Sequence, residues 1–358
     1  MNPKLQTPIN ESKTNHSTTF DLIRIVACLM IILVHAAAPY FFDFKNSTHH
    51  FWGNIYGSFV RAGVPMFIVL SGMLLLPVQI SYKDFLKRRM GRILFPFAIW
   101  AVIYFLYQGI DFNTGIATIV KKTARLLFTF PDSGEHLWYL YMLVGLYLFM
   151  PIISPWLKIA SKKEEQFFIA IWVVSLFIPF ISKVIPNLWG VASWWNEFGA
   201  LHYFSGFIGF LVIGHYLNKY QMKSNIYIIL AALLFIFGYV ITSFGQHYMY
   251  NKTGQFGPNI WNNISLNVAI MTVAAVVLLQ NITIKTIWLK KLMKELADKS
   301  FGIFLIHYLI VFKLDGYLFT TSLHPAVIIP LNTIVTLAIS YLGVKIISFL
   351  PFKKYIIG

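Results

Sequence analysis

The chain has 358 residues, of which 58% are hydrophobic and only 12% are charged, and its mean hydropathy is +0.67. Soluble domains carry about a quarter charged residues, so this composition excludes a soluble globular domain, a disordered chain and a disulfide-rich secreted scaffold. The sequence therefore predicts an integral membrane protein. The single cysteine, Cys28, excludes an intramolecular disulfide and lies in an apolar run, which predicts a small buried thiol.

Ten apolar runs of spanning length follow one another, because about 20 apolar residues cross a bilayer. They lie at about 20–41, 53–77, 93–110, 136–154, 166–186, 201–217, 226–244, 263–281, 301–319 and 327–350. The third and sixth runs are short, which predicts tilted or broken helices. We expect an all-α protein of about ten transmembrane helices, with residues 20–350 as one membrane domain.

The formal net charge of +16 does not indicate nucleic-acid binding, because the basic residues lie between apolar runs and not along one polar face. Their distribution instead indicates how the chain is oriented across the membrane. With the N-terminus inside, 21 of the 29 Lys and Arg residues fall on the inner side and 8 on the outer side. The positive-inside bias predicts that both termini are cytoplasmic. Residues 1–19 lack a signal-peptide pattern, and we interpret 1–19 and 351–358 as cytoplasmic tails.

Three segments outside the runs have helical apolar spacing. Residues 81–92 and 288–300 are basic and amphipathic, which predicts short helices at the cytoplasmic interface. Residues 111–135 are expected to lie on the outer face.

The first run carries three ionisable residues, and ionisable groups within a membrane are costly enough to suggest function. Arg24 and His35 are eleven residues apart, so they differ by about 20° in azimuth, and His35 lies about 16 Å farther along the helix. Asp21 falls within about 60° of both. Imidazole suits proton transfer near neutral pH, whereas Asp21 and Arg24 also fit an interfacial pair and His35 a bond to a neighbouring helix.

The second run has Arg61 in its outer half, followed by Pro65 and by Ser71-Gly72. A proline frees a backbone carbonyl, and small residues allow helices to approach closely. Arg61 fits two interpretations equally: a contact with outer head groups, or the lining of a cavity that holds an anionic or hydroxyl-rich group.

The inner end of the third run holds Arg88, Arg89 and Arg92. The three-residue spacing places Arg89 and Arg92 on one helix face, and paired guanidinium groups suit bidentate phosphate capture. A basic juxtamembrane segment is also typical of a lipid head-group anchor.

Polar residues gather at the predicted outer surface as well. Glu135, His136 and Trp138 open the fourth run, and an aromatic outer segment at 188–204 contains Glu197 and His202. Aromatic rings stack on sugars, although an interfacial aromatic belt explains most of them without a ligand. His307 in the ninth run is typical of a helix–helix hydrogen bond or a cavity lining. No phosphate-loop, dinucleotide or Cys/His metal motif is present, so we expect no metal.

Taken together, these motifs resemble the membrane acyltransferase-3 family, the O-acyltransferases of surface carbohydrates. The resemblance rests on Arg24 and His35, on 61–76, on the Arg89-x-x-Arg92 pair, on 136–153 and on 300–311, in that order over nearly the whole chain. It resembles members such as the enterobacterial common antigen O-acetyltransferase, which consist of the membrane domain only. No appended esterase-type domain is expected.

The resemblance implies transfer of an acyl group, most often acetyl, from cytoplasmic acyl-CoA to a sugar hydroxyl, in a bacterial inner membrane. It implies His35 as general base with Arg24 and Asp21 beside it, and donor binding by Arg89, Arg92, Arg88 and Ser71. It implies acceptor binding by Arg61, Glu135, His136, Trp138, Glu197 and His202. An acyl-His35 intermediate is the mechanistic alternative.

Two other classes of function stay open on the sequence alone: a transporter or flippase for a lipid-linked glycan, and a membrane scaffold. Expected partners are acyl-CoA, membrane lipids and a surface or lipid-linked glycan, with lipopolysaccharide O-antigen or capsule preferred, and no nucleic acid. The acceptor hydroxyl, the acyl group and assembly into a homo-oligomer stay open.

Overall fold

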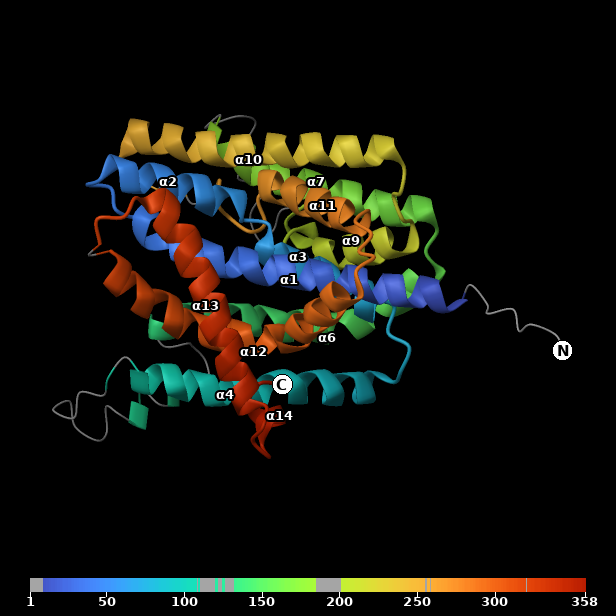
Figure 1. Ribbon diagram of the computed structural model, residues 1–358. Helices are drawn as coiled ribbons and strands as arrows, with labels where there is room; N and C mark the ends of the chain where they lie inside the picture. The colour runs from blue at the N-terminus through green and yellow to red at the C-terminus, as the bar shows by residue number, and fades with distance from the viewer. Residues whose placement is uncertain are drawn as a thin grey trace. The chain divides into compact units, whose positions relative to one another are not determined.

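The structure is a computed structural model (Figure 1) that describes residues 9–107, 109, 120–121, 124–125, 132–184, 201–254, 256–257, 259–319 and 321–358. Every regular element in these ranges is helical, which confirms the all-α prediction. Seven helical stretches of the described part are long and apolar enough to cross a membrane, and a shorter apolar helix occurs at Leu266–Gln280. Residues 111–119, which open the predicted outer segment, lie outside the described residues.

Each of the ten apolar runs corresponds to helix in the structure. In chain order the helices are α1 (Ile9–Phe41), α2 (Ser47–Phe59), α3 (Gly63–Leu75), α4 (Tyr82–Tyr107), η2 (Asp132–Leu137), α6 (Trp138–Ile159), α7 (Lys162–Val184), η3 (His202–Phe204), α9 (Ile208–Lys219), α10 (Asn225–Thr253), α11 (Leu266–Gln280), α12 (Ile287–Leu318), α13 (Pro325–Ile347) and α14 (Lys353–Ile356). The second run is divided between α2 and α3.

Two boundaries differ from the sequence predictions. The third run is not short, because α4 has 26 residues and includes the basic segment 82–92. In the same way the amphipathic segment 288–300 continues directly into the ninth run as one 32-residue helix, α12. α4 continues through Pro96, and α12 contains no proline. The sixth run is short as expected, since α9 has 12 residues.

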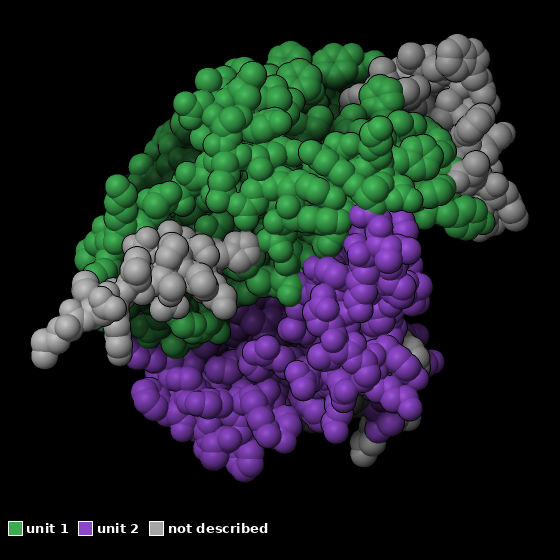
Figure 2. Space-filling model, turned by 90° about the vertical axis from the view of Figure 1, so that its right-hand side faces the viewer, with its two compact units in different colours: residues 1–74, 161–300, 323–330 green, residues 75–160, 301–322, 331–358 purple. Residues whose placement is uncertain are grey.

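The chain divides into two compact units, coloured separately in Figure 2. Unit 1 comprises residues 1–74, 161–300 and 323–330, and unit 2 comprises residues 75–160, 301–322 and 331–358. Each unit has its own buried apolar core. Cys28, in unit 1, is buried as predicted.

In unit 1, α10 packs along α11 and α2, and α1 packs along α2 (Figure 1). Glycines set the closest approaches. A Cβ atom added at Gly72 of α3 would overlap the Leu211 backbone of α9, and one added at Gly214 of α9 would overlap the Val69 carbonyl of α3. This confirms the close helix approach expected at Ser71-Gly72 and names α9 as the partner.

In unit 2, α4 packs against α6, η2 and α14. The Trp100 indole N–H donates to the Ile356 carbonyl at 2.9 Å, and the rings of Phe95 and Tyr355 meet edge to face at 5.2 Å. The C-terminal tail predicted for 351–358 is therefore a packed element on α4.

Candidate active site

The polar stripe predicted on α1 begins with an ion pair. Arg24 Nη1 lies 3.7 Å from Asp21 Oδ1, one helical turn away. Asp21 is buried and Arg24 is partly exposed. The two residues that the spacing placed on one face therefore do contact each other.

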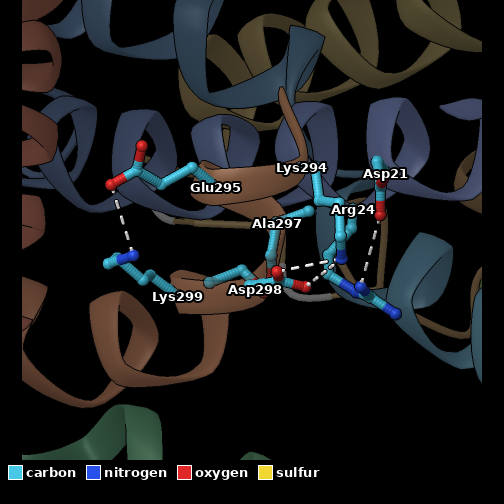
Figure 3. Close-up of polar contacts among 8 residues, drawn as sticks. Asp21, Arg24, Lys294, Glu295, Ala297, Asp298 and Lys299 are labelled. Atoms are coloured by element: carbon cyan, nitrogen blue, oxygen red, sulfur yellow. Dashed lines mark hydrogen bonds and ion pairs between the residues drawn. The ribbon is translucent and has the colours of Figure 1, made fainter. Parts of the chain in front are cut away.

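The amphipathic start of α12 adds two further charges to this pair. Lys294 Nζ donates to Asp298 Oδ2 at 3.0 Å, and Figure 3 shows their side chains converging with that of Arg24. Asp21 lies within electrostatic range of both Lys294 and Asp298. The cluster holds two positive and two negative charges, so it is close to neutral as a whole.

His35 lies on the same stripe of α1, three turns beyond Arg24. Its side chain is half-buried, as is that of Arg24, whereas Ile23, Ala27 and Ile31 of the neighbouring face are almost fully buried. The stripe thus borders the packed face of α1 rather than lying within it. An imidazole placed there remains partly accessible, as a general base that meets a substrate must be.

Arg61 lies in a break between two helices. α2 ends at Phe59 and α3 begins at Gly63, so residues 60–62 form a turn inside a stretch long enough to span. The Arg61 Nε donates to the Trp261 carbonyl at 3.0 Å, its Nη2 donates to the same oxygen, and its Cζ lies 4.8 Å from the centre of the Trp261 ring. Arg61 therefore ties the break to the segment before α11.

Aromatic residues surround this tie at the end of α1. The Phe41 ring stacks on Trp261 with centroids 3.9 Å apart, and His50 Nδ1 donates to the Phe41 carbonyl at 2.6 Å. His50 also lies 4.1 Å from the Tyr250 ring and is buried. Sequence reasoning missed this cluster, because its members come from four separate segments.

The three arginines of α4 take the arrangement that the spacing predicted. Arg89 is half-buried, with its Cζ 5.9 Å from the centre of the Phe85 ring, while Arg88 and Arg92 are exposed. Because α4 is continuous through this segment, Arg89 and Arg92 share one helix face. The packed C-terminal segment places Gly358 beside the Arg92 backbone.

Ser71, expected with the donor-binding residues, donates its hydroxyl to the Phe67 carbonyl of its own helix at 2.9 Å. It is half-buried. The bond occupies the hydroxyl proton within α3.

The residues predicted at the start of the fourth run do not share one environment. Glu135 is exposed, whereas His136 is 3% exposed and stacks on Tyr308 with centroids 4.5 Å apart. Trp138 is half-buried, beside Tyr139. The 3₁₀ turn of η2 directs the His136 ring into the core of unit 2 and leaves Glu135 at the surface.

His307 also belongs to this core. It is fully buried, and its Nδ1 donates to the Phe304 carbonyl of its own helix at 2.6 Å. The burial and the bond within its own helix agree with a structural role for His307 rather than with a role as general base. Glu197 lies outside the described residues, and His202 is exposed in η3.

Two buried polar clusters escaped sequence reasoning. In unit 1, the fully buried Glu165 accepts hydrogen bonds from His215 Nδ1 and from Lys219 Nζ, each at 2.9 Å. In unit 2, Asp315 Oδ1 accepts from the Asn332 amide at 2.7 Å. In a sequence, charged residues near the ends of apolar runs are interpreted as residues at the membrane interface. Only the fold shows that the carboxylates of Glu165 and Asp315 are buried.

Within the ranges that the structure describes, no group of three or more His, Cys, Asp or Glu side chains is placed to hold a metal ion. The chain instead offers a helix stripe with an imidazole and a separate basic helix face. This is a multi-pass membrane protein with chemistry-bearing residues on its helices.

A family model described as an acyltransferase domain, acyltransferase-3, matches residues 18–345. The match covers nearly the whole chain, so the chain belongs to this family of membrane acyltransferases. No curated protein and no solved structure matches the chain.

Proposed function

We propose that the protein transfers an acyl group, most often acetyl, from acyl-CoA to a hydroxyl of a cell-surface polysaccharide or its lipid-linked precursor, with lipopolysaccharide O-antigen or capsule preferred. Membership of the family supports acyl transfer rather than transport or scaffolding. The observation that carries the proposal for this chain is the α1 stripe, where a partly accessible His35 follows an ion-paired Arg24 on one face.

In this reaction His35 removes the proton of the acceptor hydroxyl as its oxygen attacks the thioester carbonyl. The new C–O bond forms, the C–S bond breaks, and the CoA thiolate takes the proton from the imidazolium. Arg24, held by Asp21, is a positioning residue that keeps the inner end of the stripe polar. Arg61 and the exposed Glu135 and His202 are the proposed contacts of the acceptor, with His136, Trp138 and Glu197 in supporting positions.

Arg89 and Arg92, with Arg88 beside them, are proposed to bind the phosphates of acyl-CoA at the cytoplasmic surface. Guanidinium groups on one helix face match the bidentate geometry of phosphate. The charge bias places this end of α4 inside, which suits a cytoplasmic donor and a bacterial inner membrane.

The first experiment measures glycan acylation by mass spectrometry in cells that express His35→Ala at wild-type membrane abundance. We expect loss of the acyl mass increment. His247→Ala is the matched control, because His247 is exposed on α10 and bonds only to Asn251 within its own helix among the contacts described. Normal acylation by His35→Ala would remove His35 from the mechanism.

The second experiment measures acetyl-CoA binding to the purified protein by calorimetry. Losing one charge-assisted phosphate contact costs about 1.5–3 kcal/mol, or about ten- to a hundredfold in affinity. Arg89→Lys should also weaken binding, since Lys keeps the charge and loses the fork. Unchanged affinity in both Arg89→Lys and Arg92→Ala would assign these arginines to lipid head groups instead.

A further inference from the structure

A second region of unit 1, apart from the α1 stripe, has the form of a ligand site. A cavity of about 450 Å³ lies among α7, α9, α10 and α11. Its lining is almost wholly apolar, and it is about three times the ~150 Å³ that suffices for one benzene molecule in an engineered protein core. A cavity of this size and lining fits hydrocarbon and not a sugar or a nucleotide.

The lining shows where this cavity opens. Trp172 and Ala274 at its base are 1% and 2% exposed, whereas Val173, Leu230 and Leu234 are at least one-third exposed. The opening is therefore on the outward surface of α7 and α10. Only 17% of the most apolar window of α10 is buried, as expected of a helix whose outward surface contacts lipid.

Polar groups lie next to the cavity, beside Tyr216. Tyr216 lines it, accepts a hydrogen bond from the Gln166 amide at 2.9 Å and contacts the Tyr220 ring at 4.9 Å. Two ammonium groups lie over Tyr220, Lys219 Nζ at 5.1 Å and Lys162 Nζ at 5.2 Å from the ring centre.

The local charge balance is positive. The segments 161–165 and 218–224 hold four lysines and two glutamates, which leaves an excess of two positive charges. The hydrogen bond to Glu165 raises the pKa of Lys219, so this ammonium is charged at neutral pH. Both segments lie on the side that the charge bias predicts to be cytoplasmic.

We propose that unit 1 binds an anionic glycerophospholipid of the inner leaflet, with one acyl chain in the α7–α9–α10–α11 cavity and its phosphate against Lys162. Basic residues at a membrane surface and an apolar cavity beside them match the two parts of such a lipid. The site is independent of the proposed acyl transfer, since it uses none of the residues assigned to that reaction.

The experiment is native mass spectrometry of the full chain, purified in detergent and titrated with phosphatidylglycerol or with phosphatidylcholine of the same chains. We expect one phosphatidylglycerol to bind more tightly than phosphatidylcholine. Lys162→Glu should lower the phosphatidylglycerol affinity about 25-fold, since each unit of charge near the surface contributes about fivefold. Lys252→Glu is the matched control, because Lys252 also lies over a tyrosine ring, at the opposite end of α10.

The chain pocket is tested with Ala231→Phe, which fills the cavity from α10, against Ile236→Phe at an exposed position of the same helix that does not line it. We expect only Ala231→Phe to abolish retention of the lipid. Phosphatidylglycerol with a photoreactive acyl chain should label the cavity residues of the wild-type protein. This measurement tests the proposal even if Ala231→Phe does not fold. Labelling elsewhere, or equal binding of both lipids and all variants, would overturn the proposal.

Discussion

Replacement of Arg61 by Met tests whether this arginine holds the fold or binds the acceptor. Met keeps the length of the side chain but removes the charge and both N–H donors to the Trp261 carbonyl. Hydrogen bonds from charged groups contribute about 1.5–3 kcal/mol, and a desolvated cation–π contact about 2 kcal/mol. Because such terms overlap, we expect Arg61→Met to lower the free energy of unfolding by about 2–4 kcal/mol.

The assay is reversible unfolding of the detergent-solubilised protein, followed by tryptophan fluorescence. The chain has 10 tryptophans, so the signal reports global unfolding, to which Trp261 beside the guanidinium contributes. Lys252→Met is the control: its ammonium lies 5.7 Å from the centre of the Tyr248 ring and is exposed, so the change should stay within about 0.5 kcal/mol.

One result would refute a structural role for Arg61. Should Arg61→Met unfold like wild type and yet lose acyl transfer, the tie to Trp261 would be incidental and Arg61 would contact the acceptor. Arg61→Lys separates the two roles further, since Lys cannot reproduce the two N–H bonds to one carbonyl oxygen.

Three more perturbations address the helix packing and the buried carboxylates. Glu165→Ala removes the partner of both His215 and Lys219, and breaking such a buried pair costs about 3–5 kcal/mol of unfolding free energy. Calorimetric unfolding measures this cost, and a loss of less than about 1 kcal/mol would contradict a buried pair. Gly214→Leu forces a side chain into the backbone of α3, so we expect at least 3 kcal/mol of destabilisation or no folded protein by size-exclusion chromatography, and wild-type stability would disprove the close approach. Asp315→Ala should cost about 1–3 kcal/mol in chemical unfolding and Asp315→Asn less, because Asn keeps an acceptor oxygen; equal costs would show that this bond is not the cause.

The sequence predicted the helices well because apolar periodicity and run length are local properties. All ten runs became helix, and the short α9 was expected. The break at residues 60–62 was not placed, because Pro65 lies a turn later and a proline in the first turn of a helix leaves that helix intact. The break is visible only where Arg61 finds the Trp261 carbonyl.

In the candidate site, contacts within one helix were predictable from the sequence, and contacts between distant segments were not. Asp21 and Arg24 share one helix, so their contact followed from the spacing alone. Arg61 and Trp261 are 200 positions apart, and Glu165 and His215 are 50 apart. No periodicity links such pairs, which explains why sequence reasoning gave Arg61 two equal interpretations and overlooked Glu165.

The charge balance of the α1 cluster bears on which arginines meet an anionic donor. Arg24 is paired with Asp21, and the neighbouring Lys294 is paired with Asp298. An approaching phosphate would have to displace a carboxylate to use Arg24 fully. The neutral cluster therefore suits a positioning role better than phosphate capture.

The α4 face differs in this respect. Among the ion pairs found in the described part of the chain, none involves Arg88, Arg89 or Arg92. The acidic residue of the same helix start, Asp84, instead accepts the hydroxyl of Ser81 at 2.7 Å. Three guanidinium groups with no carboxylate partner among the described residues attract a polyanion without first losing an ion pair. The observed pairing thus favours the α4 arginines over Arg24 for the phosphate-binding role proposed above.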